Sequence, residues 1–254
     1  MCTCSAKLKR IAKPRGSACG SLSGSNGSPV ELENRAVTGV EGRVRCGARV
    51  SDGFPTHTGQ EFLEFLRALA ASSQASPSPT PIEKFLSEHP AAFAFVQAPK
   101  PSPASFATEA YFAVTAMRFT NASGASRFGR YRILPDAGMQ HLDASVSSGK
   151  DPDYLFAELQ KRIGSGPIGF RIEVQLAEDS DVVDNATVHW PDNRPLAPFG
   201  HFTLDAIVPE NEAQQKRIIF DPIPRLDGID PSDDPLLELR AAIYLLSGRR
   251  RRAA

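Results

Sequence analysis

The sequence predicts an α+β domain in which helices surround an antiparallel sheet. Residues 168–177 alternate strictly between apolar and polar side chains, as in a strand with one buried face. Residues 111–120 and 126–134 are apolar or alternating runs on either side of the turn 121–124, and this pattern indicates a hairpin. Apolar residues at helical spacing before and after these strands complete the mixed class.

Capping residues, prolines and glycines set the boundaries of the other elements. Thr58 is a favoured N-cap, and the apolar residues after it recur three and four positions apart as far as Leu69. Asp234 and Pro235 likewise suit the N-cap and the first position of a last helix. In chain order we expect a helix from Thr58 to the Ser- and Pro-rich run 72–81, a short helix over 81–88, an extended connector over 98–105, the hairpin, a helix over 151–162 ended by the glycines of 164–166, the strand 168–177, a strand over 199–208, a short helix over 212–217, a strand over 217–220 and the last helix from Asp234.

The composition excludes several classes of protein. The chain has 254 residues, 41% of them hydrophobic, with 29 acidic and 29 basic residues, so it can form one sizeable core and has no net charge to attract nucleic acid. No stretch approaches the ~18 uninterrupted apolar residues of a membrane span, and the N-terminus lacks the apolar segment of a secretory signal. We therefore expect a cytoplasmic protein with neither nucleic acid nor membrane as a partner; a periplasmic location would follow if an upstream signal segment is missing.

Residues 1–50 differ in composition from the rest of the chain. They hold all four cysteines, Cys2, Cys4, Cys19 and Cys46, in a stretch rich in Ser, Gly, Lys and Arg and poor in periodic apolar positions. The cysteines lack the paired CxxC spacing of a zinc site and have no histidine nearby, so we expect reduced thiols in a disordered segment. The folded domain is accordingly expected to span residues 51–254.

The last predicted helix carries the most informative pair of residues. Arg240 and Tyr244 are four positions apart, so their side chains share one face of the helix. A guanidinium beside a phenol favours the phenolate, because an opposite charge stabilises the ionised form. A tyrosinate is an anionic ligand of haem iron in some hydroperoxidases. Taken alone, such a pair is more often a surface arginine beside a half-buried tyrosine.

The pair belongs to a series of motifs that occur in a fixed order. The others are residues 109–112, 118–122, 127–131, 175–177, 190–191, 220–222, 228–232, 233–237 and 249–252. Together they resemble the catalase superfamily, and most closely its small bacterial branch, the catalase-related peroxidases. The resemblance covers residues 52–254 and implies a catalase-like antiparallel β-barrel with surrounding helices, incomplete at the N-terminus. It also implies a haem (heme b) cofactor and the reduction of hydrogen peroxide or organic hydroperoxides with an unknown electron donor.

The resemblance assigns roles to individual residues. Tyr244 would be the axial ligand of the haem iron, and Arg240 would keep its phenolate ionised. Arg251 falls where the family has a haem-propionate partner, although a solvated basic helix end explains it equally well. Phe54 and Phe62 align with aromatic residues that flank the distal face of the haem; as sequence features alone they are ordinary core positions.

The distal acid–base group of the family is not found in the sequence. Catalase-like proteins place a distal histidine before the region that matches Gly53, and residues 1–52 contain no histidine. His57 is the candidate for this role, because it lies close to the distal segment in the family pattern and an imidazole is suited to proton transfer near neutral pH. The other four histidines are expected to be solvated or structurally satisfied: His89, His141, His189 and His201.

Three functions remain open. The first is a haem-dependent hydroperoxidase. The second is a truncated, catalytically impaired haem-binding relative, because the distal histidine is missing. The third is a non-haem module that binds a small molecule, with Tyr244 merely packed. For Arg127 and Arg130 on the second hairpin strand, both a solvent-exposed face and contact with a haem edge are open. The sequence gives no indication of the oligomeric state.

Overall fold

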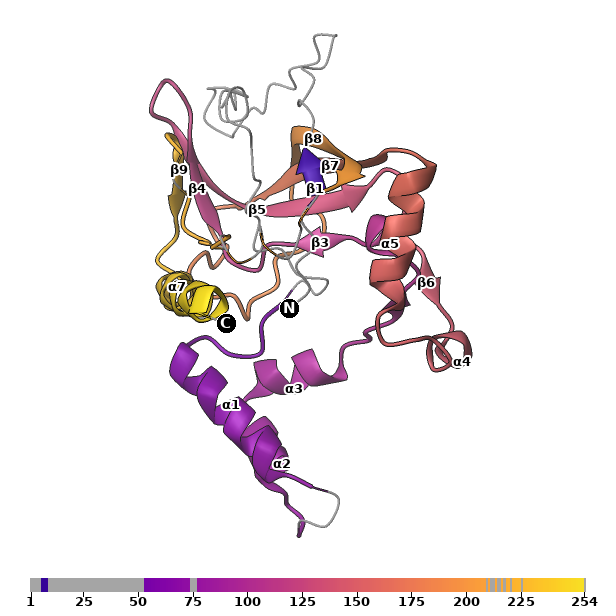
Figure 1. Ribbon diagram of the computed structural model, residues 1–254. Helices are drawn as coiled ribbons and strands as arrows, with labels where there is room; N and C mark the ends of the chain where they lie inside the picture. The colour runs from indigo at the N-terminus through magenta and orange to yellow at the C-terminus, as the bar shows by residue number, and fades with distance from the viewer. Residues whose placement is uncertain are drawn as a thin grey trace.

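The structure of the chain is a computed structural model that describes residues 6–8, 53–73, 77–208, 210, 213, 216, 218–219, 221–224 and 226–253 (Figure 1). An antiparallel sheet forms its centre, with helix α5 (Tyr154–Ser165) at one end and helix α7 (Pro235–Ala253) at the other. A smaller group of helices, α1 (Gly59–Ala71), α2 (Pro81–Glu88) and α3 (Pro90–Gln97), lies on the α7 side, away from the sheet. The predicted α+β class is confirmed.

The sheet has seven strands in the order β1-β8-β7-β5-β4-β9, and β3 pairs with β5 beside this path. All these pairs are antiparallel. The strands are β1 (Ala6–Leu8), β3 (Tyr111–Phe112), β4 (Met117–Thr120), β5 (Ser126–Pro135), β7 (Ile168–Leu176), β8 (Leu196–Ile207) and β9 (Ile229–Pro231), while β2 (Ser102–Pro103) and β6 (His141–Leu142) form a separate pair. Among the described strands β1 and β9 do not pair, so this part of the chain does not form the closed barrel that the resemblance implies.

One face of the sheet carries the main core. The even-numbered residues of β7 are all buried, as the predicted alternation requires. Leu159 and Ile163 of α5 pack against the first half of β7, and Leu237 of α7 packs against its second half. The two helices therefore close opposite ends of one apolar face.

Local signals explain where α1 and α2 begin. The Thr58 and Thr80 hydroxyls accept hydrogen bonds from the backbone N–H groups of Glu61 and Glu83, whose carboxylates bond back to the cap, so each helix starts with a capping box. This confirms the predicted cap at Thr58. The three helices share a small core of their own, formed by Phe65, Phe85 and Ala92.

Helix α3 was not expected from the sequence. Pro90 occupies its first turn, which suits a proline, but the same proline also suits the end of the preceding helix. The segment 90–97 is almost entirely apolar and shows no helical periodicity. Its identity as a helix therefore depends on packing against α2.

Other predicted elements are present with shifted boundaries. The first hairpin strand is interrupted at 113–116, and its two parts, β3 and β4, both pair with β5. Within the interruption, Val114 packs in a cluster with Leu236 of α7, and Ala116 packs in another cluster with Trp190. Helix α5 begins at Tyr154, three residues after the predicted start. The Asp151 carboxylate accepts a hydrogen bond from the backbone N–H of Asp153, and this turn precedes the helix. Short helical turns also occur at η2 (Phe106–Thr108) and α4 (Ala144–Ser147).

Several expectations fall partly or wholly outside the residues that the structure describes. The predicted reduced state of the four cysteines lies outside the described residues. The predicted disorder of residues 1–50 also stays a prediction, except at residues 6–8, which form strand β1. Of the helix predicted over 212–217, only Ala213 and Lys216 are described, and both are helical. The strand predicted over 217–220 is wrong for Ile218 and Ile219, which pair with no strand because they contact α7 instead.

No helix in the described part of the chain combines the length and the apolar character that crossing a membrane requires.

Candidate functional site

The start of α7 is fixed by a buried carboxylate. Asp234 is 2% exposed, and its Oδ1 accepts a hydrogen bond from the backbone N–H of Leu236 at 2.9 Å, which confirms the predicted N-cap. Burial raises the pKa of Asp234, while the Leu236 N–H and the charges of His57 and Arg130 oppose that rise. Within the described residues its Oδ2 has no hydrogen-bond partner. Leu236 and Leu237 then anchor the first turn in the core.

Arg240 and Tyr244 lie together on α7, as their spacing predicts. The Arg240 Nη2 donates to the Tyr244 hydroxyl at 3.4 Å, and the guanidinium carbon lies 5.4 Å from the centre of the phenol ring. Both side chains are half-buried. Among the described residues, Arg240 Nε is buried without a hydrogen-bond partner. The pair therefore presents a phenol oxygen beside a guanidinium with donor capacity left over.

Phe54 and Phe62 meet next to the same helix. Their ring centres are 4.8 Å apart, and both pack with Leu236 and Leu239 of α7. Gly59, at the start of α1, allows this approach, because a Cβ atom there would lie 2.1 Å from the Leu239 Cδ2. The two phenylalanines thus form an apolar wall beside the first half of α7.

His57 lies at the junction of α1 and α7. Its backbone N–H donates to the Glu61 carboxylate at 2.9 Å, and its side chain is half-buried. Burial raises the pKa of Asp234 and an electrostatic interaction with His57 opposes that rise, so the imidazole lies within electrostatic range of the start of α7. Of the five histidines, His57 is the one that electrostatics links to this helix.

Three other histidines have protein partners, as expected. His89 Nδ1 is 2.8 Å from the Phe85 carbonyl oxygen, His141 Nε2 is 3.2 Å from the buried Glu109 carboxylate, and His201 Nε2 is 2.7 Å from the Asp136 carboxylate. His189 lies so close to Gly53 that a Cβ atom there would be 2.5 Å from its Nε2. Hydrogen bonds therefore give His89, His141 and His201 structural roles, and His189 packs beside Gly53.

The C-terminal turn of α7 is tied to residues 218 and 219. Arg251 donates to the Ile218 carbonyl and, at 2.7 Å, to the Ser247 hydroxyl. Gly248 permits the close approach of Ile219, whose Cγ1 would lie 3.0 Å from an added Cβ. Two donors of the Arg251 guanidinium are therefore engaged, and its remaining donors could contact a carboxylate.

Of the two alternatives left open for Arg130, the structure excludes the solvent-exposed strand face. It is 3% exposed, it donates to the carbonyl oxygens of Val188 and Asn185, and its guanidinium stacks on Trp190 at 4.2 Å. Arg127 also turns inward, where it donates to the Ala177 carbonyl. The burial of Arg130 could not be predicted from the sequence, because the loop that covers it lies more than 50 residues further along the chain.

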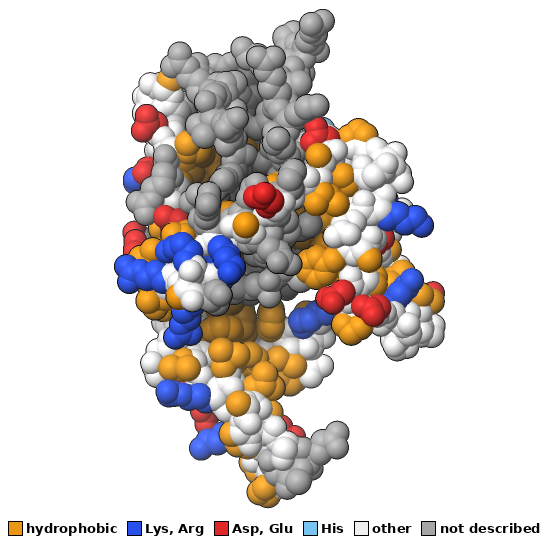
Figure 2. Space-filling model, in the orientation of Figure 1, with side chains coloured by type: hydrophobic (Ala, Val, Ile, Leu, Met, Phe, Trp, Pro, Cys, Tyr) orange, Lys and Arg blue, Asp and Glu red, His pale blue; other side chains and the backbone are white. Residues whose placement is uncertain are grey.

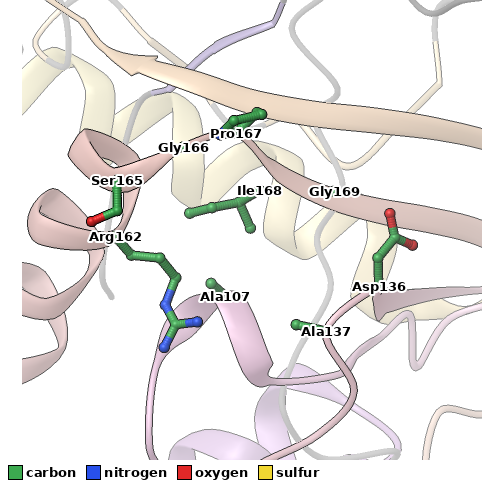
Figure 3. Close-up of a pocket in the computed structure, with 9 residues that line it drawn as sticks. All are labelled: Ala107, Asp136, Ala137, Arg162, Ser165, Gly166, Pro167, Ile168 and Gly169. Carbon is green, nitrogen blue, oxygen red and sulfur yellow. The ribbon is translucent and has the colours of Figure 1, made fainter.

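A cavity of about 440 Å³ lies elsewhere, between the end of α5 and the start of β7 (Figure 3). Its charged side chains are already paired: Arg162 with Glu158 at 2.6 Å, and Asp136 with His201 at 2.7 Å. In the described part of the chain no group of three or more His, Cys, Asp or Glu side chains could hold a metal ion. The described residues of this cavity therefore offer no unpaired charged side chain.

Known proteins share both the sequence and the fold. Residues 54–254 match the catalase family. A catalase-related peroxidase of Mycolicibacterium paratuberculosis is 33% identical over 235 residues, which cover 88% of this chain and 74% of that protein. The chain belongs to the catalase family. A catalase-related peroxidase of Synechococcus elongatus is 30% identical over 69% of this chain and 52% of its own length.

Solved catalases have the same fold. A fungal catalase and catalase A of Saccharomyces cerevisiae superpose with TM-scores of 0.69 and 0.68, each at 20% identity over 80% of this chain. The chain spans less than half the length of these catalases, 44% and 45%. The relatives that match over most of this chain place it in the catalase-related peroxidase branch, and catalase-family members normally bind haem.

Proposed function

We propose that this chain is a haem-dependent hydroperoxidase that reduces hydrogen peroxide or organic hydroperoxides, with Tyr244 as the axial ligand of the haem iron. The observation that carries the proposal is the Arg240–Tyr244 pair on α7, in a chain that matches the catalase family over residues 54–254. A phenolate is the anionic ligand that ferric haem takes from tyrosine, and a neighbouring guanidinium favours that phenolate.

The residues around the pair fit such a group. Phe62 is half-buried and supplies apolar surface of the kind that a porphyrin requires, and the buried Phe54 supports it from the core; both lie against the same helix. The spare donors of Arg240 and Arg251 suit carboxylate groups, so Arg251 would hold a propionate in addition to its protein contacts. When bound, haem would supply the redox-active iron at which a peroxide bond is cleaved.

The protein's own groups would order the site and move protons. Reducing a hydroperoxide to an alcohol and water consumes two protons and two electrons, and the electrons come from an external donor. Arg240 would keep the Tyr244 oxygen anionic, and the Asp234 cap would hold the helix in register. His57 is the candidate for the proton-transferring imidazole, because it lies where α1 meets α7.

This assignment predicts slow turnover. The family places a distal histidine before the region that matches Gly53, and residues 1–52 contain no histidine. General acid–base catalysis contributes about 10²- to 10⁴-fold to a rate, so we expect a chain with a family N-terminus to exceed this one by a factor in that range. Equal rates for the two chains would contradict the view that the missing distal histidine limits the turnover of this chain.

The first test is a spectrum of the full chain expressed with a supply of haem. We expect a Soret band that Tyr244→Phe abolishes or shifts, because the anionic oxygen ligand is lost. Tyr154→Phe is the matched control, because Tyr154 lies on α5 and its hydroxyl donates to the Pro103 carbonyl of β2. This substitution should leave the spectrum unchanged. Protein without a Soret band, or a Soret band identical in the Tyr244 variant, would overturn iron ligation by Tyr244.

The second test separates the alternative functions. Peroxide-dependent oxidation of a dye by the holo-protein, at a rate well above that of free haemin, supports the hydroperoxidase. A haem-loaded chain no faster than haemin would be a catalytically impaired relative. A colourless chain that binds an apolar small molecule would be a non-haem module.

A further inference from the structure

The solvent-facing side of the C-terminal half of α7 is apolar over residues 243–246 and basic over residues 249–252. The apolar side chains there are 41–55% exposed, although Leu and Ile side chains are usually buried. Residues 239–254 include no acidic residue, and Figure 2 shows Lys and Arg side chains gathered at this end of the molecule. We define the α7 outer face as Ile243, Leu245, Leu246, Arg249, Arg250 and Arg252.

The six side chains of this face take no part in the Arg240–Tyr244 contact. Arg240 and Tyr244 contact each other on the inward side of the helix, and Arg251 is turned toward the Ile218 carbonyl. Leu245 and Ile243 are each about 100° around the helix from Tyr244, and Leu246 about 200°. The outer face is therefore turned away from the Tyr244 phenol.

The charges on the face are not neutralised within the described structure. No described acidic side chain forms an ion pair with Arg249, Arg250 or Arg252, whereas other exposed arginines do: Arg118 pairs with Asp230, and Arg171 with Glu173. Two copies of the chain meeting through this face would bring like charges together, which disfavours self-association. A nucleic acid would neutralise the arginines but would leave the leucines without an apolar partner.

We propose that the α7 outer face binds the surface of membranes that contain anionic lipids. Exposed apolar side chains next to a cluster of arginines suit a membrane surface that contains anionic lipids, because the apolar side chains can enter the acyl boundary and the cations can meet the lipid phosphates. The sequence predicted no membrane partner, because no stretch is long and apolar enough to span a bilayer. The local arrangement on α7 leads to the opposite conclusion for this surface.

The test is sedimentation of the purified full chain with vesicles. Vesicles of phosphatidylcholine with phosphatidylglycerol should bind the protein, vesicles of phosphatidylcholine alone should not, and high salt should release it. Each arginine near an anionic surface contributes about fivefold to binding, so the triple variant R249Q/R250Q/R252Q should lose roughly a hundredfold. Leu245→Ser with Leu246→Ser should also weaken binding, at unchanged charge.

The matched control is the triple variant R67Q/R118Q/R171Q, which removes three exposed arginines from other parts of the chain and leaves the same net charge. It should bind anionic vesicles as the unmodified chain does, and circular dichroism should show that all variants are folded. Three results would overturn the proposal: no binding to anionic vesicles, equal losses in the two arginine variants, or equal binding of a DNA duplex with no effect of the leucine substitutions.

Discussion

The sheet core and the second half of α7 differ in how their apolar side chains are used. In the sheet, Phe119 is 2% exposed and meets Tyr131 and Phe199 edge-on, with ring centres 5.4 Å and 5.8 Å apart. On α7, Ile243 and Leu246 are about half exposed, and the Arg240–Tyr244 contact is long, at 3.4 Å.

The difference shows where stability and chemistry lie in this chain. Burying a large aromatic side chain contributes more than a long hydrogen bond between half-exposed groups does. The sheet and the first turn of α7 therefore hold the fold together, and the later turns of α7 carry the Arg240–Tyr244 pair with fewer packing contacts. Substitutions in the two regions should accordingly have separable effects on stability and on ligand binding.

The largest expected effect is in the sheet core. Phe119→Ala should lower the free energy of unfolding by about 3–5 kcal/mol, because it leaves a cavity among packed rings. Phe93→Ala is the matched control, since Phe93 on α3 is 50% exposed and its loss should cost less than about 1 kcal/mol. Denaturant unfolding of both variants measures the comparison, and equal losses would show that the sheet core is not the main source of stability.

A smaller effect is expected where β9 joins the sheet. Gly228 has φ +80°, and a Cβ atom there would lie 2.7 Å from the Thr120 carbonyl oxygen, so Gly228→Ala should cost about 2–4 kcal/mol. Gly124→Ala provides the control, because Gly124 has φ +85° but open space around it, and only the backbone strain of about 1 kcal/mol applies. Similar melting temperatures for the two variants would exclude the steric contribution of Thr120.

The smallest effects concern pH, and the two carboxylates involved should respond with opposite signs. Hydrogen bonds from Arg194 lower the pKa of Asp181, so its stabilising contribution is present above the unfolded value of about 3.9 and is lost as the pH falls through the folded value. Burial raises the pKa of Asp234, so its contribution is present below about 3.9 and is lost as the pH rises through the folded value.

Asparagine variants test these signs. Asp181→Asn should cost about 1–2 kcal/mol at pH 7 and little at low pH, because it removes the charge from two bonds with Arg194. Asp234→Asn retains an oxygen that can cap Leu236, so it should gain stability relative to the unmodified chain as the pH rises. Urea unfolding at several pH values provides the measurement. Parallel curves for the two variants would contradict the assigned directions.

The elements that could be predicted from the sequence are those with local signals. Thr58 and Asp234 begin helices through bonds to residues two or three positions away, and the alternation of β7 needs only its own residues. Strand β9 could not be predicted, because Gly228 and Pro231 suggest a turn and its pairing with β4 depends on residues over 100 positions earlier. Long-range pairing is not visible in a short window of sequence.

The same distinction applies to the candidate site. Arg240 and Tyr244 could be paired from the sequence, since one helical turn determines their proximity. The burial of Arg130 could not, because its partners, Asn185 and Val188, belong to a distant loop. The packing of Phe54 and Phe62 on Leu239 also required the fold, although their aromatic character suggested a core position.

The stack of Arg130 on Trp190 gives the chain a built-in optical reporter. Trp190 is its single tryptophan and is 4% exposed, so all tryptophan emission comes from one buried position. The loop that Trp190 ends also accepts a hydrogen bond from the backbone N–H of Phe54, at the Ala186 carbonyl. A change in tryptophan fluorescence would therefore report a change at the junction between the sheet and the apolar wall of Phe54 and Phe62, without any added label.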